Sequence, residues 1–81
     1  MYRVEYSRHA RAQVDSLGPV GRQALADTLA QLRRDPSVGH RAPGYPPEFH
    51  TVAFGEWGLA FYLVWERRGT IVLLDVIWAG A

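Results

Sequence analysis

Residues 48–78 read EFHTVAFGEWGLAFYLVWERRGTIVLLDVIW, and this stretch decides the fold. Aromatic and β-branched side chains dominate it, as is typical of β-strands. Three strand-like runs can be distinguished in it, at residues 48–54, 59–66 and 70–78. Residues 55–58 (GEWG) and 67–69 (RRG) separate these runs and are typical of hairpin connections. The stretch therefore predicts a three-strand meander.

The last two of these strands are apolar on both faces, so they lack the alternation of a half-buried strand. In the run 59–66, one face carries Leu59, Phe61, Leu63 and Trp65 and the other carries Ala60, Tyr62 and Val64. In the run 70–78, Ile71, Leu73 and Ile77 similarly oppose Val72, Leu74, Val76 and Trp78. A helix layer can cover only one face, so the other must be covered by curvature of the sheet, by a partner chain or by a second copy, and we expect a partner. The predicted partner surface consists of Tyr62, Val64, Trp65 and Trp78. The alternative is that the tryptophans fill an ordinary core.

The residues before the meander predict one strand and two helices. Residues 2–7 alternate between apolar and polar side chains, which is typical of a strand. Ser7 has the chemistry of a helix N-cap, and the helix that follows it should break at residues 18–19 (GP). A second helix fits residues 20–34 and ends at residues 35–36 (DP). The short link between the helices predicts an antiparallel helical hairpin.

Residues 37–47 contain three of the five prolines and two glycines, so we expect an irregular surface loop that does not join the sheet. With 81 residues the chain has room for one core, and we expect a single domain over residues 1–81. The chain contains no cysteine, which excludes disulfides, thiolate metal sites and thiol catalysis. Neither a signal peptide nor a membrane span is predicted, and we expect a cytoplasmic protein.

The order of strand, two helices, loop and meander resembles the RelE/ParE superfamily of bacterial toxin–antitoxin systems. The resemblance rests on four motifs: residues 2–7 (YRVEYS) leading into Ala10, 32–36 (LRRDP), 55–57 (GEW) and 61–64 (FYLV). It implies an α+β fold of order β-α-α-β-β-β, with a two-helix hairpin packed on an antiparallel-type sheet. It also implies an antitoxin partner, and a target that is ribosome-bound mRNA in the RelE branch or DNA gyrase in the ParE branch.

The sequence departs from this family in its chemistry. Cutting RNA without a metal needs a base, an acid and a cation beside the phosphate, and RelE-like toxins supply these largely with basic residues. The corresponding positions fall on or near Phe49, Thr51, Ala53 and Gly58, and residues 78–81 (WAGA) stand where the family has a basic tail. We therefore expect weak or absent ribonuclease activity.

Four other residues are candidates for catalysis or for binding RNA. His50 is the candidate catalytic acid or base, because imidazole titrates near neutral pH. It lies one position out of register with the family's basic residue, so the alternative is a strand histidine on the opposite face. Arg41, Arg67 and Arg68 are candidate RNA or phosphate contacts, or else solvated loop side chains. The histidine spacings match no metal-ligand motif, and no metal or other cofactor is predicted.

Three functional hypotheses remain open at this stage. The first is a toxin-family protein that acts mainly through protein binding, with an antitoxin as partner. The second is an active, metal-independent mRNA endoribonuclease that works on the ribosome, and it predicts that His50, Arg41, Arg67 and Arg68 converge. The third is a self-associating module that forms a homodimer and has no toxicity.

Overall fold

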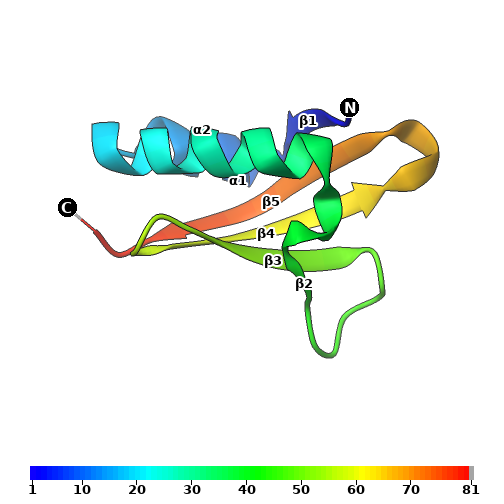
Figure 1. The fold of residues 1–81 in the computed structure, drawn as a ribbon. Helices are drawn as coiled ribbons and strands as arrows, with labels where there is room; N and C mark the ends of the chain where they lie inside the picture. Colours follow the sequence, from blue (N-terminus) through cyan, green and yellow to red (C-terminus); the bar gives the residue numbers. More distant parts are fainter. Residues whose placement is uncertain (81) are drawn as a thin grey trace.

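The computed structural model describes residues 1–80 as two helices packed on one side of a five-stranded sheet (Figure 1). The elements in chain order are β1 (Arg3–Tyr6), α1 (Arg8–Asp15), α2 (Pro19–Arg34), a 3-10 turn η1 (Pro36–Val38), β2 (His40–Arg41), β3 (Phe49–Phe54), β4 (Gly58–Trp65), a 3-10 turn η2 (Glu66–Arg68) and β5 (Thr70–Trp78). The fold is of the predicted α+β class. The domain and tail predictions extend to Ala81, which lies outside the described residues.

The sheet has the strand order β1-β5-β4-β3-β2. Strands β3, β4 and β5 form the predicted antiparallel meander. Strand β1 lies beside β5 and runs parallel to it, so the sheet is mixed rather than purely antiparallel. The parallel pairing is possible because the whole chain between β1 and β5, including both helices, serves as the crossover connection.

The expectation that residues 37–47 stay out of the sheet is wrong at one point. His40 and Arg41 form β2 and pair antiparallel with Thr51 and His50 of β3. The physical reason is that the prolines flank this dipeptide without interrupting it, so both residues keep the N–H groups that an edge strand needs.

The helix ends follow the local signals that predicted them. The Ser7 hydroxyl accepts a hydrogen bond from the Ala10 N–H at 3.0 Å and caps α1. Helix α2 begins at Pro19, where the missing N–H costs nothing, and ends at Arg34. Asp35 then caps η1 through its carboxylate, which accepts from the Ser37 N–H at 3.1 Å. The predicted second helix is thus correct to within one residue.

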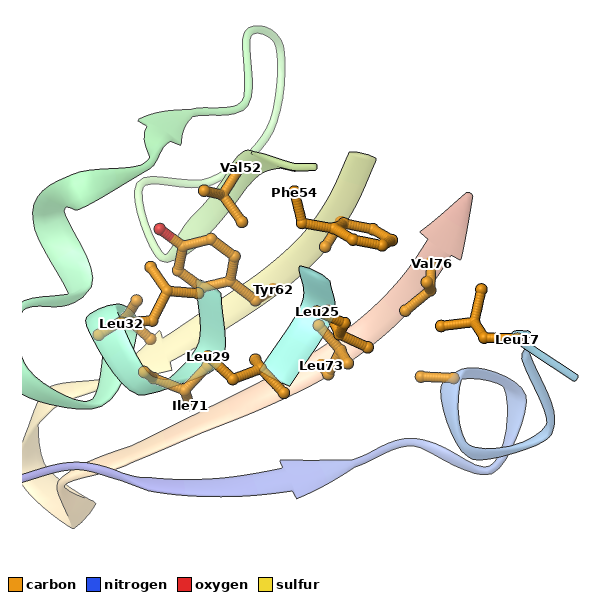
Figure 2. Close-up of a cluster of buried hydrophobic side chains, with 13 residues drawn as sticks. Leu17, Leu25, Leu29, Leu32, Val52, Phe54, Tyr62, Ile71, Leu73 and Val76 are labelled. Carbon is orange, nitrogen blue, oxygen red and sulfur yellow. The ribbon is translucent and has the colours of Figure 1, made fainter. Parts of the chain in front are cut away.

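The core lies between α2 and the inner face of the meander. Figure 2 shows Leu25, Leu29 and Leu32 of α2 directed at side chains of the sheet. The fully buried sheet residues include Phe54, Tyr62, Ile71 and Leu73. The side chains of β4 alternate strictly, because Ala60, Tyr62 and Val64 are buried while their neighbours in the strand are at least partly exposed.

Strand β5 contains a β-bulge that changes which side chains face the core. Phe61 of β4 pairs with Asp75, whereas the next residue, Tyr62, pairs with Leu73, so Leu74 is the extra residue. An extra residue shifts the alternation of a strand by one position. The alternation between core-facing and outward-facing side chains is therefore reversed after the bulge.

The predicted faces of β5 were wrong for this reason. Ile71 and Leu73 are buried before the bulge, and Val76 is buried after it. Ile77, predicted to share a face with Ile71 and Leu73, is 50% exposed.

Helix α1 contacts the bulge through polar groups. The Gln13 amide oxygen accepts a hydrogen bond from the Val76 N–H at 2.7 Å, and its nitrogen donates to the Asp75 carboxylate at 2.7 Å. The Ser7 hydroxyl donates to the Leu74 carbonyl at 3.1 Å. These bonds satisfy backbone groups of β5 beyond the end of β1, where the strand would otherwise present an unpaired edge.

Candidate functional site

The face of the sheet opposite the helices carries an apolar strip along β4 and β5 and has no covering layer in residues 1–80 (Figure 1). We call it the open sheet face and define it by five side chains: Leu59, Phe61, Leu63, Val72 and Ile77. Leu59 pairs across strands with Ile77, and Leu63 pairs with Val72, so these residues form two apolar cross-strand pairs, while Phe61 between them pairs with Asp75. Leu59 is 38% exposed and Ile77 is 50% exposed.

The predicted partner surface is therefore placed on the wrong side of the sheet for most of its residues. Tyr62 and Val64 are buried in the core beneath α2, because they occupy the inward positions of β4. Trp78 is half-buried on the helix side, where its ring stacks on Phe54 with centroids 5.5 Å apart. Only Trp65 of the predicted set is exposed, at 43%.

A second feature is a solvent-open cavity of about 680 Å³ on the edge of the sheet where α2 ends. Its walls come from η1, the start of β3, the end of β4 and the β4–β5 connection. Arg41 and His50 line it together with Arg67 and Arg68, which come from a separate part of the sequence. The convergence that the endoribonuclease hypothesis requires is therefore present. We call this the arginine cavity.

No ion pair within residues 1–80 includes an arginine of the cavity, although Asp35, Glu48 and Glu66 also line it. Within residues 1–80 the ion pairs are Arg3–Glu5 and His9–Asp75, both at 3.3 Å, and neither involves a cavity arginine. Arg68 instead lies over the ring of Trp65, with its guanidinium carbon 5.0 Å from the ring centroid. The cavity thus presents guanidinium groups whose N–H donors remain available to a ligand.

His50 points to the helix side of the sheet and stacks on Tyr62, with ring centroids 5.3 Å apart and planes at 21°. Its Nδ1 lies 3.0 Å from the Glu48 carbonyl oxygen. Because a carbonyl only accepts, Nδ1 carries the hydrogen in this contact. The pairing of β3 with β4 runs without a shift from Phe49 to Phe54, so Thr51 projects from the opposite face.

Two further groups near the cavity have shifted pKa values. Burial raises the pKa of Tyr62 to about 12, and the Asp35 carboxylate adds to this shift while the Gly39 backbone opposes it. The Tyr62 hydroxyl donates its proton to the Pro36 carbonyl at 2.8 Å. Hydrogen bonds from the Ser37 hydroxyl and N–H lower the pKa of Asp35. Asp35 therefore stays ionised at neutral pH.

The remaining histidines lie elsewhere. His9 is on α1 beside Asp75, and His40 pairs with Thr51 at the sheet edge. Over residues 1–80 no three histidine, aspartate or glutamate side chains are grouped closely enough to hold a metal ion. No helix in this part of the chain is long and apolar enough to cross a membrane.

Neither the family models nor the curated proteins contain a match to this sequence. The fold, in contrast, has clear counterparts among solved structures. The isolated RelE toxin of Escherichia coli matches with a TM-score of 0.85 at 17% identity, over 100% of this chain and 87% of that one. The RelBE2 toxin–antitoxin complex of Mycobacterium tuberculosis matches with a TM-score of 0.76 at 23% identity, over 95% of this chain and 96% of that one.

The chromosomal ParDE toxin–antitoxin system of P. aeruginosa matches with a TM-score of 0.69 at 19% identity, over 99% of this chain and 98% of that one. These matches extend over nearly the whole chain. They include structures from both the RelE and the ParE branch of the superfamily that the sequence resembles. The chain therefore has the RelE/ParE fold.

Proposed function

We propose that this chain is a divergent toxin-family protein of a toxin–antitoxin system and that it acts mainly through protein binding. An antitoxin is the proposed partner, and the open sheet face is its proposed binding surface. The solved relatives support this proposal, because two of them are toxin–antitoxin systems. We place the proposed action in the cytoplasm, where the targets of such toxins are found.

The proposal rests mainly on the open sheet face. Its five side chains are all apolar, and they include two cross-strand pairs between β4 and β5. Soluble monomers rarely expose a contiguous apolar patch of this kind unless a partner covers it. A flat sheet face of this length suits an amphipathic segment of a partner chain, which would bury its own apolar side chains against these pairs.

Conventional RelE-type ribonuclease activity is proposed to be weak or absent. The positions where the family places its basic residues are here Phe49, Thr51, Ala53 and Gly58, none of which can neutralise a phosphate or move a proton. His50 projects from the other side of β3, and the Tyr62 proton is bound to the Pro36 carbonyl. The four positions that match the family's basic residues therefore provide neither an acid nor a base.

A second candidate function is a ribosome-dependent mRNA endoribonuclease that uses the arginine cavity. One observation favours it: His50 and the three arginines line the same cavity. His50 Nε2 would accept the proton of a ribose 2′-hydroxyl, and the guanidinium groups would stabilise the charge that develops on the phosphate.

Induction in a bacterial host, with and without the neighbouring gene, separates these functions. We expect that the product of the neighbouring gene co-purifies with this chain, and that mapping of mRNA ends shows no new cleavage when an active RelE-type toxin is the control. New cleavage ends that disappear in His50→Ala would replace the leading proposal by the second candidate. Growth arrest with intact mRNA and altered DNA topology would indicate the gyrase branch.

The binding surface has its own test. Leu59→Asp places a charge on the open sheet face, and Val20→Asp places the same charge at a more exposed apolar position on α2, where Val20 is 68% exposed. We expect that Leu59→Asp abolishes co-purification and Val20→Asp preserves it. Equal loss in both variants would contradict the proposed surface. A concentration-independent dimer of the isolated chain, broken by Leu59→Asp, would support the homodimer hypothesis instead.

A further inference from the structure

We propose that the free edge of β1, together with the groove beside it, binds the C-terminal end of a partner polypeptide as an added antiparallel strand. The groove lies between β1 and α2 and has a volume of about 400 Å³. We call it the β1 groove, and its lining residues are Arg3, Val4, Tyr6, Ala26, Leu29, Ala30 and Arg33. It lies on the helix side of the sheet, away from the open sheet face, so the inference goes beyond the proposed function and does not depend on it.

The backbone of β1 has hydrogen-bonding groups that the sheet does not use. Strand β1 is an edge strand, because it pairs only with β5. The Arg3 N–H donates to the Gly69 carbonyl at 2.8 Å, and the Ser7 N–H donates to the Leu73 carbonyl at 2.9 Å. Because backbone groups point alternately to the two sides of a strand, those of Val4 and Tyr6 point away from β5. Two N–H groups and two carbonyls are therefore available to an added strand.

The free edge ends at Tyr2. The Tyr2 N–H donates to the Arg33 carbonyl at 2.8 Å, and the Tyr2 carbonyl accepts from the Arg33 Nε at 3.1 Å. The end of α2 thereby occupies the place that a longer added strand would take. A strand that runs antiparallel to β1 approaches this point with its C-terminal end, so its chain must either end there or turn away. A chain terminus meets this requirement without a turn.

Two arginines lie at the point where the added strand would end. Arg3 and Arg33 line the β1 groove, and none of its lining residues is acidic. The hydrogen bond from Arg33 to Tyr2 uses Nε, so the N–H groups on its two terminal nitrogens remain for a ligand. Arg3 pairs with Glu5 at 3.3 Å, but both side chains are largely exposed, and such pairs contribute little. A terminal carboxylate can therefore accept charge-assisted hydrogen bonds from both guanidinium groups.

The floor of the β1 groove suits an apolar side chain. Ala26 and Ala30 lie one turn apart on α2 and are exposed, and Leu29 beside them is buried. The small alanine side chains leave room above them. Val4 and Tyr6 face the same side of the sheet, where they pack against the core. Residues that lie directly opposite each other in antiparallel strands share a face, so partner residues opposite Val4 and Tyr6 would point into the groove.

These features together define one register for the bound strand. The last partner residue would lie opposite Val4, with its N–H donating to the Val4 carbonyl and its carboxylate accepting from the Val4 N–H. The same carboxylate would meet Arg3 and Arg33. The residue two positions earlier would lie opposite Tyr6 and exchange both backbone hydrogen bonds with it. The ligand is thus an extended polypeptide end with an apolar last residue and a free carboxylate.

Fluorescence anisotropy with the full chain tests this ligand. The probes are N-terminally labelled peptides of about six residues, the length of an ordinary strand, which alternate threonine and valine and end in alanine, valine, leucine or phenylalanine. We expect at least one of them to bind. We expect its C-terminal amide, and a version extended by a short glycine-serine segment, to bind at least about tenfold more weakly, because each lacks the carboxylate beside the arginines. An amidated version with aspartate added after the apolar residue tests whether an acidic side chain can replace the terminus.

Substitutions locate the binding. Arg33→Gln should weaken binding of the free-carboxylate peptide by about tenfold. Its matched control is Arg34→Gln, because Arg34 is also an exposed arginine at the end of α2 but does not line the groove. Ala30→Leu should fill the groove and weaken binding by at least about tenfold, whereas Ala12→Leu at an exposed position of α1 should leave it unchanged. Leucine and alanine are both good helix formers, so these variants keep the fold.

Hydrogen exchange gives a second measurement, since the bound peptide should slow exchange of the Val4 and Tyr6 amides. The inference is overturned if no peptide binds at concentrations up to about 1 mM, or if the amide or the aspartate version binds as tightly as the free carboxylate. It is also overturned if Arg34→Gln weakens binding as much as Arg33→Gln, or if binding leaves exchange at Val4 and Tyr6 unchanged. Leu59→Asp should not alter peptide binding, so failure of this inference and failure of the proposed function give different outcomes.

Discussion

Replacing Tyr62 should destabilise the domain strongly, because this residue fastens the end of the helix layer to the sheet. Tyr62 is the largest of the fully buried side chains. Its hydroxyl donates to the Pro36 carbonyl at 2.8 Å, across 26 positions of sequence. Tyr62→Phe removes the hydroxyl while keeping the ring, whereas Tyr62→Ala removes both.

The structure gives the expected magnitudes. In Tyr62→Phe the Pro36 carbonyl loses its donor in a partly buried site, which costs about 1–3 kcal/mol. In Tyr62→Ala a void also opens under α2, and truncation of a buried aromatic ring costs about 3–5 kcal/mol. A domain of this size is stabilised by only about 4–12 kcal/mol, so the alanine variant should be close to unfolding at 37 °C.

Urea unfolding followed by circular dichroism measures both variants, with Trp65→Ala as the control. Trp65 is also an aromatic residue of β4, but it is 43% exposed and makes a surface contact with Arg68, so its loss should cost about 1 kcal/mol or less. The reasoning is refuted if Tyr62→Phe changes the free energy of unfolding by less than about 0.5 kcal/mol. It is equally refuted if Trp65→Ala is as destabilising as Tyr62→Ala.

Three further predictions concern the contact of α1 with β5 and the surroundings of Tyr62. Gln13→Ala should cost about 1–3 kcal/mol, because it leaves the Val76 N–H of the bulge without an acceptor, and hydrogen exchange at that amide should accelerate. Gly39→Ala should cost about 1–3 kcal/mol in urea unfolding, because a Cβ at Gly39 would overlap the Tyr62 hydroxyl and the Thr51 carbonyl; a stability equal to the wild type would contradict this contact. Since the folded chain raises the pKa of Tyr62 from 10.0 to about 12, the unfolded chain loses this proton first, and stability should be complete below pH 10 and fall as the pH rises toward 12. Tyr62→Phe should lack this decline, and an identical alkaline profile in the variant would show that other groups cause it.

Local signals were sufficient to predict most of the fold. Ser7 and residues 18–19 bracket the first helix, and residues 35–36 end the second, because capping and proline act within a few residues. The meander was equally predictable, because each of its turns is marked by glycine: Gly55 and Gly69 both adopt positive φ. The two-residue strand β2 was missed, because pairing with β3 depends on a neighbour and not on its own sequence.

The candidate sites were less predictable. The sequence predicted His50 as a candidate catalytic residue and Arg41, Arg67 and Arg68 as candidate RNA contacts, and all four line one cavity. The predicted partner surface failed for Tyr62 and Val64, because a strand that is apolar on both sides does not tell which side the helices cover. The alternating set of Leu59, Phe61 and Leu63 was the better signal, since it contains the more exposed residues of β4.

The sequence by itself determined the two helices, four of the five strands and their order. Helix caps, turn glycines and apolar periodicity are local properties. The absence of basic residues at the positions where the family has them is also read directly from the sequence. Only the tertiary structure decided which sheet face is open, because the bulge at Leu74 and the helix layer fix the phase of each strand. It also decided that arginines far apart in the sequence meet at one cavity, since that meeting depends on how the β4–β5 connection lies against β2 and η1.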